Sequence, residues 1–264
     1  MSVHIVSSMD KLWIWGIFFK NFMNKEEFLR KYYTNWNVWL ESITLGDISE
    51  WIENLKWKTD DTSLEIIAKR KTDLYAFYIS LVEIFIINHL VIKEENLEFF
   101  FEENPHNRIT SYLANKSKFE SLVNFCFTID LWFLVNQDQT IQQYKEFIRF
   151  SFENYKEDFK FLNAYKHWRR ILPFWKESSS EKGDSLIFFY QKKRNSSSLY
   201  SCEIWFNWED IFFATYFLID SIDNMRRLYL WEDATTSYAT LDNSSFSRIN
   251  SIYRNESEIL SSIA

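Results

Sequence analysis

Apolar residues recur every three or four positions along most of this chain, and this spacing places them on one face of a helix. The clearest run consists of Ile148, Phe152, Tyr155, Phe159 and Leu162. Asparagine, aspartate or threonine followed three residues later by glutamate marks several helix starts. We predict helices over residues 25–42, 48–57, 63–92, 108–136, 139–172 and 207–231.

The period of the pattern changes after Pro173, which lacks an amide donor and disfavours helical geometry in the residue before it. Residues 185–191 form a short apolar run, and apolar residues alternate with others from Tyr200 to Phe206. Alternation is the period of a half-buried strand. The chain is therefore predicted to be mainly α, a helical bundle with a short β-hairpin near residues 185–206.

The end of the chain is richer in serine, threonine and asparagine from Ala234 onward. We expect either a loosely ordered tail or one terminal helix built on Ile249, Ile252, Tyr253 and Ile259. No repeat or long linker divides the sequence, so we predict a single mainly helical domain over residues 1–264. It would consist of N-terminal helices (1–60), a helical core with the hairpin (61–232) and a polar C-terminal tail (233–264).

Composition removes several classes of function. With only 3 Gly in 264 residues, the chain has no glycine-rich phosphate loop, dinucleotide fingerprint or nucleophile elbow. A net charge of −7 argues against broad capture of nucleic acid, although it leaves room for a local basic pocket. Cys126 and Cys202 lie far apart in apolar stretches, which indicates free thiols in a reducing, cytoplasmic setting.

An apolar stretch from Leu74 to Ile92 is long enough to suggest a membrane span, but it contains Glu83 at its centre. A charged group at that depth costs several kcal/mol, on the order of 3. We therefore expect a buried central helix and no membrane contact. A buried carboxylate needs a cation or a proton, so Glu83 is predicted to pair with Lys166, His167 or Arg170.

The segment 163–170 gathers polar and basic residues where an apolar helical face should continue. At helical spacing, Asn163, Lys166, His167 and Arg170 would lie together at the rim of the core. As a catalytic site, His167 would transfer a proton and Arg170 would stabilise charge on an anion, with Asn163, Lys166 and Arg169 as substrate-binding residues. As a structural cluster, the same polar groups would tie loops to the helix, and the arginines would offset the negative end of its dipole.

Metal and cofactor chemistry has no support in the sequence, since His4, His89, His106 and His167 are scattered without metal-ligand spacing. We predict neither a metal nor a cofactor.

The order of elements over roughly residues 60–232 resembles the HEPN superfamily of helical bundles. The resemblance rests on a long apolar helix containing Glu83, a second long helix ending in the segment 163–167, and a following hairpin and helix. It implies a toxin or phage-defence setting, RNA binding or metal-independent RNA cleavage, and a homodimer sharing one site. Active members carry an Arg separated from the His by four to six intervening residues, whereas this chain has Leu162, Phe161 and Lys160 at those positions before His167.

A second hypothesis needs no chemistry. The chain would be a non-catalytic protein-interaction or regulatory subunit that docks a protein partner through its acidic, aromatic-rich surface. The Asn/Lys/His cluster would then be structural.

Overall fold

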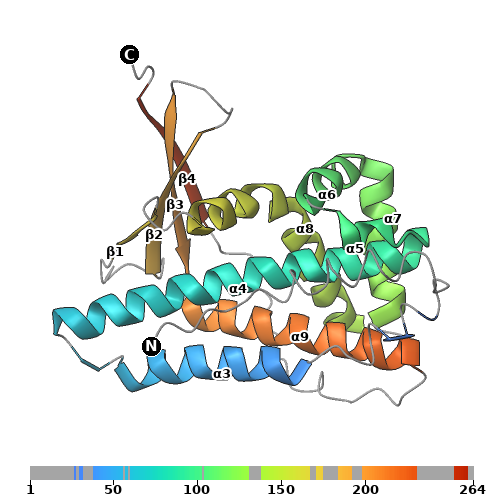
Figure 1. Cartoon of the computed structure of the whole chain (residues 1–264), viewed down its shortest axis with the longest axis horizontal. Helices are drawn as coiled ribbons and strands as arrows, with labels where there is room; N and C mark the ends of the chain where they lie inside the picture. Colours follow the sequence, from blue (N-terminus) through green and yellow to red (C-terminus); the bar gives the residue numbers. More distant parts are fainter. Residues whose placement is uncertain are drawn as a thin grey trace.

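The computed structural model describes residues 27, 30–31, 38–55, 57–58, 60–102, 104–130, 138–166, 171–174, 184–191, 198–230 and 253–260. These residues form seven helices and one four-stranded antiparallel sheet (Figure 1). The helices are α3 (Val38–Leu55), α4 (Asp61–Glu94), α5 (Glu98–Phe101), α6 (Pro105–Leu113), α7 (Lys116–Asp130), α8 (Asp138–Lys166) and α9 (Trp208–Leu230). The strands are β1 (Ile171–Phe174), β2 (Asp184–Tyr190), β3 (Leu199–Phe206) and β4 (Tyr253–Leu260). The protein is thus mainly α with a small sheet, as predicted.

Helix α4 is the central element, and α3 and α9 run alongside it (Figure 1). Its first turn is capped by Asp60, whose carboxylate accepts a hydrogen bond of 2.9 Å from the Ser63 amide. It ends at Glu95, which adopts a left-handed conformation with φ of 52°. Both sides of the helix are apolar, and Tyr75, Phe85 and Leu90 are buried against neighbouring helices. The predicted helix over 63–92 is confirmed.

By length and composition, Thr62–Glu94 is a helix that could cross a membrane. In this structure, 67% of its most apolar 18-residue stretch is buried inside the protein. The central helix of a soluble protein meets the same criteria, and its packing explains why a run of this length carries so few charges.

Several predicted helix boundaries are wrong. Helix α3 runs without a break through residues 42–48, because Leu45, Ile48, Ile52 and Leu55 form one continuous buried face. The predicted helix over 108–136 is instead divided into α6 and α7. The division falls at Asn115, whose side chain accepts a hydrogen bond of 3.1 Å from the Lys118 amide and so begins a new helix.

The predicted hairpin is confirmed as β2 and β3, which pair with Leu186 opposite Ile204 and Phe188 opposite Cys202. These four side chains are buried, whereas Ile187 and Glu203 on the other face are only partly covered. The alternation seen in the sequence therefore identifies the face of the sheet that packs against the helices.

The prediction that the helix over 139–172 reaches Leu172 is wrong. Helix α8 is described to Lys166, and Ile171 and Leu172 pair instead with β2 as part of β1. Strand β1 lies at the edge of the sheet, where Pro173 is tolerated because its missing amide leaves no central ladder bond unmade.

The two alternatives for the C-terminal tail are also wrong for residues 253–260, which form strand β4 along β3. Its register places Arg254 opposite Ile204 and Glu256 opposite Cys202, although Arg254 is only partly buried and Glu256 is exposed. An apolar pattern could not reveal this strand, because Arg254 and Glu256 are charged.

Arg254 joins β4 to helix α8 through hydrogen bonds. Its guanidinium donates to the Asp158 carboxylate through Nε at 3.0 Å and through Nη2, and to Asn154 Oδ1 through Nη1 at 3.0 Å. Tyr75 of α4 donates to the same Asp158 oxygen at 3.0 Å. Asp158 is only 3% exposed. Burial raises the pKa of this carboxyl, and the Arg254 guanidinium acts in the opposite direction.

Arg254→Met is expected to lower the free energy of unfolding by about 3–5 kcal/mol, because it leaves the Asp158 carboxylate buried without a counter-charge. Adding Asp158→Asn should recover part of the loss, since the unpaired charge is then gone. Urea denaturation measures both effects. Arg149→Met is the control, because its partner Glu120 is 39% exposed and the loss of a solvent-exposed ion pair should cost far less than the loss of the Arg254 pair. Equal losses at Arg254 and Arg149 would contradict the importance of the buried pair.

Candidate functional site

The last described turn of α8 carries two of the predicted site residues. Asn163 and Lys166 are both exposed and lie three residues apart, so their side chains share one side of the helix. Ala164, between them, is buried. The predicted residues His167, Arg169 and Arg170 lie outside the described residues. The structure thus presents Asn163 and Lys166 to solvent as neighbours.

Tyr165 anchors this turn to α4. Its hydroxyl donates to Asp73 Oδ1 at 2.7 Å, and Asp73 also accepts a bond of 2.9 Å from Lys69. Burial raises the pKa of Tyr165, and the Asp73 charge adds to the effect. The phenol therefore stays protonated and keeps donating. This contact holds the last described turn of α8 against α4.

Glu83 is bonded to Tyr155, whose hydroxyl donates to the carboxylate across the interface between α4 and α8. Burial raises the pKa of Glu83, while the Tyr155 hydrogen bond and the Lys166 charge lower it. Of its three predicted partners, only Lys166 lies within the described part of the chain. Lys166 influences Glu83 through its charge, and the direct hydrogen bond comes from Tyr155.

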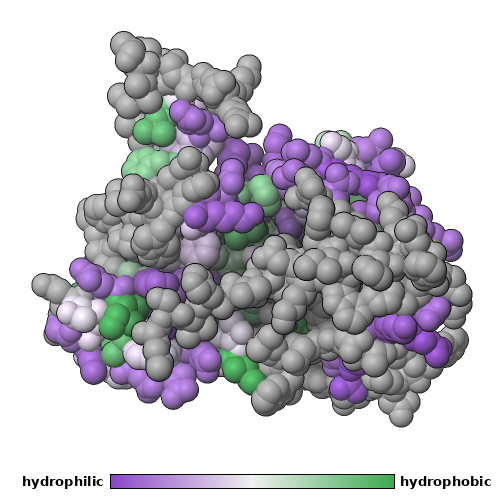
Figure 2. All heavy atoms as spheres, viewed as in Figure 1, coloured by the Kyte–Doolittle hydropathy of each residue, from purple (hydrophilic) through white to green (hydrophobic). Residues whose placement is uncertain are grey.

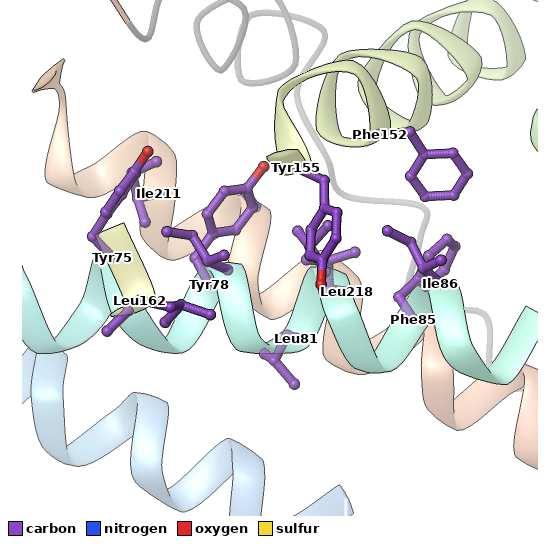
Figure 3. Close-up of a cluster of buried hydrophobic side chains, with 14 of the residues drawn as sticks. Tyr75, Tyr78, Leu81, Phe85, Ile86, Phe152, Tyr155, Leu162, Ile211 and Leu218 are labelled. Atoms are coloured by element: carbon purple, nitrogen blue, oxygen red, sulfur yellow. The ribbon is translucent and has the colours of Figure 1, made fainter. Parts of the chain in front are cut away.

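Tyrosines bridge α4 and α8 along the length of their contact. The pairs are Tyr75 with Asp158, Tyr78 with Ser151 at 3.1 Å, Tyr155 with Glu83, and Tyr165 with Asp73. Figure 3 shows Tyr75 and Tyr78 pointing away from α4, whereas Tyr155 points from α8 back toward it. Buried phenols need polar partners. The acids in this interface accept hydrogen bonds from these phenols, and in this way they help the two helices to pack together.

His106, in the first turn of α6, was not among the predicted site residues. Its ring stacks on Phe159 with centroids 3.5 Å apart and an interplanar angle of 9°, and it lies 5.5 Å from the Tyr155 ring. Its Nδ1 is buried and has no hydrogen-bond partner among the described residues. Burial lowers the pKa of His106 to about 4, and the Lys156 charge acts in the same direction. The imidazole is therefore neutral at pH 7.

Both cysteines, Cys126 and Cys202, are buried in the described part of the chain. Burial raises the pKa of the Cys202 thiol to about 11, which keeps it protonated. Across the described ranges, no group of three His, Cys, Asp or Glu residues is placed to hold a metal ion.

Sequence analysis missed Asp158 and Arg254. A usable signal existed for Asp158, which interrupts the apolar face between Tyr155 and Leu162 as Glu83 interrupts α4. No local signal existed for Arg254, because its role depends on the pairing of β4 with β3.

Four large aromatic side chains remain exposed in the described structure. They are Trp51 at 46%, Trp57 at 83%, Phe213 at 42% and Tyr216 at 40%. Trp51 lies near the end of α3, and Trp57 lies in the connection to α4. Phe213 and Tyr216 lie on α9. Their exposed surface is available for contacts outside the core.

We expect His106→Phe to keep the stack on Phe159. The variant should also lack the decrease in the free energy of unfolding that His106 causes in wild type as the pH falls. The unfolded state protonates His106 near pH 6.5 but the folded state only near 4, so wild type loses stability as pH falls between these values. The variant should gain about 1 kcal/mol relative to wild type between pH 7.5 and pH 5, allowing for partial screening by solvent. Urea denaturation at both pH values measures this gain. If the free energies of unfolding of the variant and of wild type differed by the same amount at both pH values, the lowered pKa of His106 would be refuted.

Comparison of the chain with protein-family models, with curated proteins and with solved structures gave no match. The resemblance to HEPN proteins accordingly stays a prediction.

Proposed function

We propose that this protein is a non-catalytic interaction subunit that binds another protein through the end of the helical layer where α3 leads into α4. The observation that carries the proposal is Trp57, which is 83% exposed. A tryptophan buries about 150–250 Å² when it is covered. Because most of its surface is in water, this side chain buries little area on folding, whereas as an anchor in a partner's pocket it would supply much of the binding energy.

The surroundings of Trp57 suit such a role. Trp51 lies on the preceding helix, 46% exposed, and the Arg70 guanidinium sits 5.4 Å from its ring centroid. Trp and Arg are the residue types most enriched at the energetic centres of protein interfaces. Leu64 and Ile66, in the first turns of α4, are only partly buried. Figure 2 shows apolar side chains in green at the surface over this end of α4.

The interface between α4 and α8 supports the non-catalytic part of the proposal. Glu83, Asp73 and Asp158 each accept a hydrogen bond from a tyrosine, so their carboxylates are engaged in holding the helices together. A general acid or base must instead reach a substrate proton.

Trp57→Ala is expected to weaken binding of the partner at least about tenfold while leaving the thermal midpoint nearly unchanged, because an exposed anchor contributes to binding and little to folding. The protein retained by tagged wild type from its own cells would be purified and its Kd measured by calorimetry. Lys58→Ala, at the exposed neighbouring position, is the matched control and should change Kd less than about threefold. A retained protein whose Kd is the same for wild type and Trp57→Ala would argue against this surface.

A second candidate function, RNA binding with metal-independent cleavage, is favoured by one observation. Asn163 and Lys166 are exposed side by side at the end of α8, where an amide and an ammonium group could contact a phosphate. In this hypothesis, His167 would assist attack of a ribose hydroxyl, with Arg170 and Arg169 stabilising the phosphate charge.

Incubation with a mixed RNA pool in EDTA tests the second candidate. Cleavage by wild type that is lost in a His167→Ala variant of equal thermal stability would establish the RNase hypothesis. Lys166→Ala should then weaken RNA binding and reduce its salt dependence by about one phosphate contact. Intact RNA after incubation with wild type would eliminate cleavage and leave the interaction subunit.

A further inference from the structure

Strand β4 is the outermost strand on one side of the sheet. It pairs with β3 along one edge, and within the described part of the chain no strand lies along its other edge. The backbone N–H and C=O groups of a strand point alternately to its two sides, so a strand at the edge leaves half of them without a partner strand. Figure 1 shows the last part of β4 projecting beyond the helices together with β3. The sheet therefore ends in a row of backbone groups to which a further strand could bond.

The middle of β4 is accessible on both faces of the sheet. Successive residues of a strand point to opposite faces, yet four consecutive residues of β4 are exposed. They are Asn255, Glu256, Ser257 and Glu258. The register with β3 shifts by one residue between Glu258 and Leu260. Because such a bulge ends regular pairing, residues 253–258 are the stretch that an added strand could follow.

The face of β4 that carries Arg254, Glu256 and Glu258 is acidic. The charge of Arg254 is matched by its buried partner on α8. Lys160 lies 3.7 Å from Glu256 and also pairs with Glu157. Glu258 follows two residues farther along the strand, on the same face. In the described part of the chain, three glutamates thus face one lysine, and this side of the edge keeps a negative charge.

The same charges oppose the pairing of β4 with a second copy of itself. In two antiparallel β4 strands centred on Ser257, Glu256 of one copy would lie opposite Glu258 of the other. Like charges directly opposite each other on neighbouring strands are destabilising. Lysine or arginine at those positions of an incoming strand would be stabilising, because each would face a glutamate. The charge of the edge therefore selects a basic segment.

We propose that the outer edge of β4 binds an extended basic segment of a partner protein, which adds a fifth strand to the sheet. Backbone hydrogen bonds to residues 253–258 supply the affinity, as in other cases of strand addition. Lysine or arginine side chains at alternate positions of the segment face Glu256 and Glu258. On the other face, the segment passes Asn255 and Ser257, which are uncharged and do not select a charge. This surface belongs to the sheet and is independent of the one around Trp57.

Strand β4 is held in place before a partner binds. Seven of its residues are paired with residues of β3. At its beginning, Arg254 is joined to Asn154 and Asp158 on α8. In its middle, Glu256 is paired with Lys160, whose ammonium group lies 4.6 Å from the centroid of the Tyr190 ring. An edge that is ordered before association loses less entropy when it binds.

A synthetic peptide in which lysine alternates with valine, as long as the eight residues of β4, tests the charge of the edge on the full chain. Fluorescence polarisation of the labelled peptide measures Kd. Glu256→Lys with Glu258→Lys should weaken binding at least about tenfold, because attraction becomes repulsion. Glu50→Lys with Glu65→Lys is the matched control, since it makes the same charge change at exposed positions of α3 and α4, and it should change Kd less than about threefold.

Thermal melting would establish that each variant is folded. Glu258→Lys alone provides a second test that keeps the pair between Lys160 and Glu256, and it should still weaken binding at least about threefold. Trp57→Ala should leave Kd for the peptide unchanged, which separates this proposal from the partner surface at the end of α3.

Backbone pairing is tested separately from charge. N-methylation of the peptide at its lysines removes the amide donors along one edge of the peptide, and N-methylation at its valines removes those along the other edge. Only one edge of an added strand faces β4, so one of the two methylated peptides should bind at least about tenfold more weakly than the other.

Several outcomes overturn the proposal. They are no binding up to about 1 mM peptide, the same Kd for both methylated peptides, and the same Kd when glutamate replaces lysine in the peptide. Self-association of the chain that Glu256→Lys with Glu258→Lys alters would assign the edge to a second copy, and would overturn the proposal as well.

Discussion

A single buried carboxylate, Asp158, joins three parts of this molecule that are distant in sequence. It accepts hydrogen bonds from Tyr75 of α4 and from Arg254 of β4 while sitting on α8. Removing a carboxylate from water is costly, and only a paired cation with good geometry offsets that cost. The position of β4 is therefore set by where Arg254 must reach as well as by its backbone pairing with β3. The sheet, in turn, covers the end of α8 whose last turn displays Asn163 and Lys166 (Figure 1).

The aromatic richness of the chain has a structural use that composition alone did not reveal. Tyrosine supplies an apolar ring for packing and a hydroxyl for a buried acid. In the interface between α4 and α8, Tyr75 stacks on Phe206 with centroids 5.1 Å apart while its hydroxyl reaches Asp158. Tyr155 packs beside His106 and Phe159 while donating to Glu83. The helices can thus carry acidic residues inward without opening the core to water.

The accessible chemistry of the described helices lies on three separate surfaces. One is the end of α3, with Trp51 and Trp57. Another is the first half of α9, where Phe213 and Tyr216 are exposed, and the third is the last described turn of α8. The first two are aromatic and suit protein contacts, whereas the third is polar and suits an anion. Because they lie on different helices, changes at one surface can be examined while the other two remain intact.

The sequence by itself determined the elements whose local pattern and burial agree. The three-to-four-residue period of α8 and α9, and the two-residue period of β2 and β3, each arise from one apolar face turned to the core, whereas α4 is apolar on both sides because it lies at the centre. The isolated acid Glu83, within an otherwise apolar helix, likewise predicted a buried carboxylate that needs a partner.

Only the tertiary structure decided what lies opposite each face. The hydrogen bond to Glu83 comes from Tyr155, a phenol on the facing helix that sequence analysis did not name, while Lys166 acts on the carboxylate through its charge and His167 and Arg170 lie outside the described residues. The apolar pattern of the sequence did not reveal strand β4, since Arg254 and Glu256, which lie opposite Ile204 and Cys202, are charged, and Arg254 is held in place by Asp158 on α8. The apolar period of a segment predicts which of its residues are buried. It does not report which distant group satisfies a polar side chain, and that choice depends on how the elements meet in space.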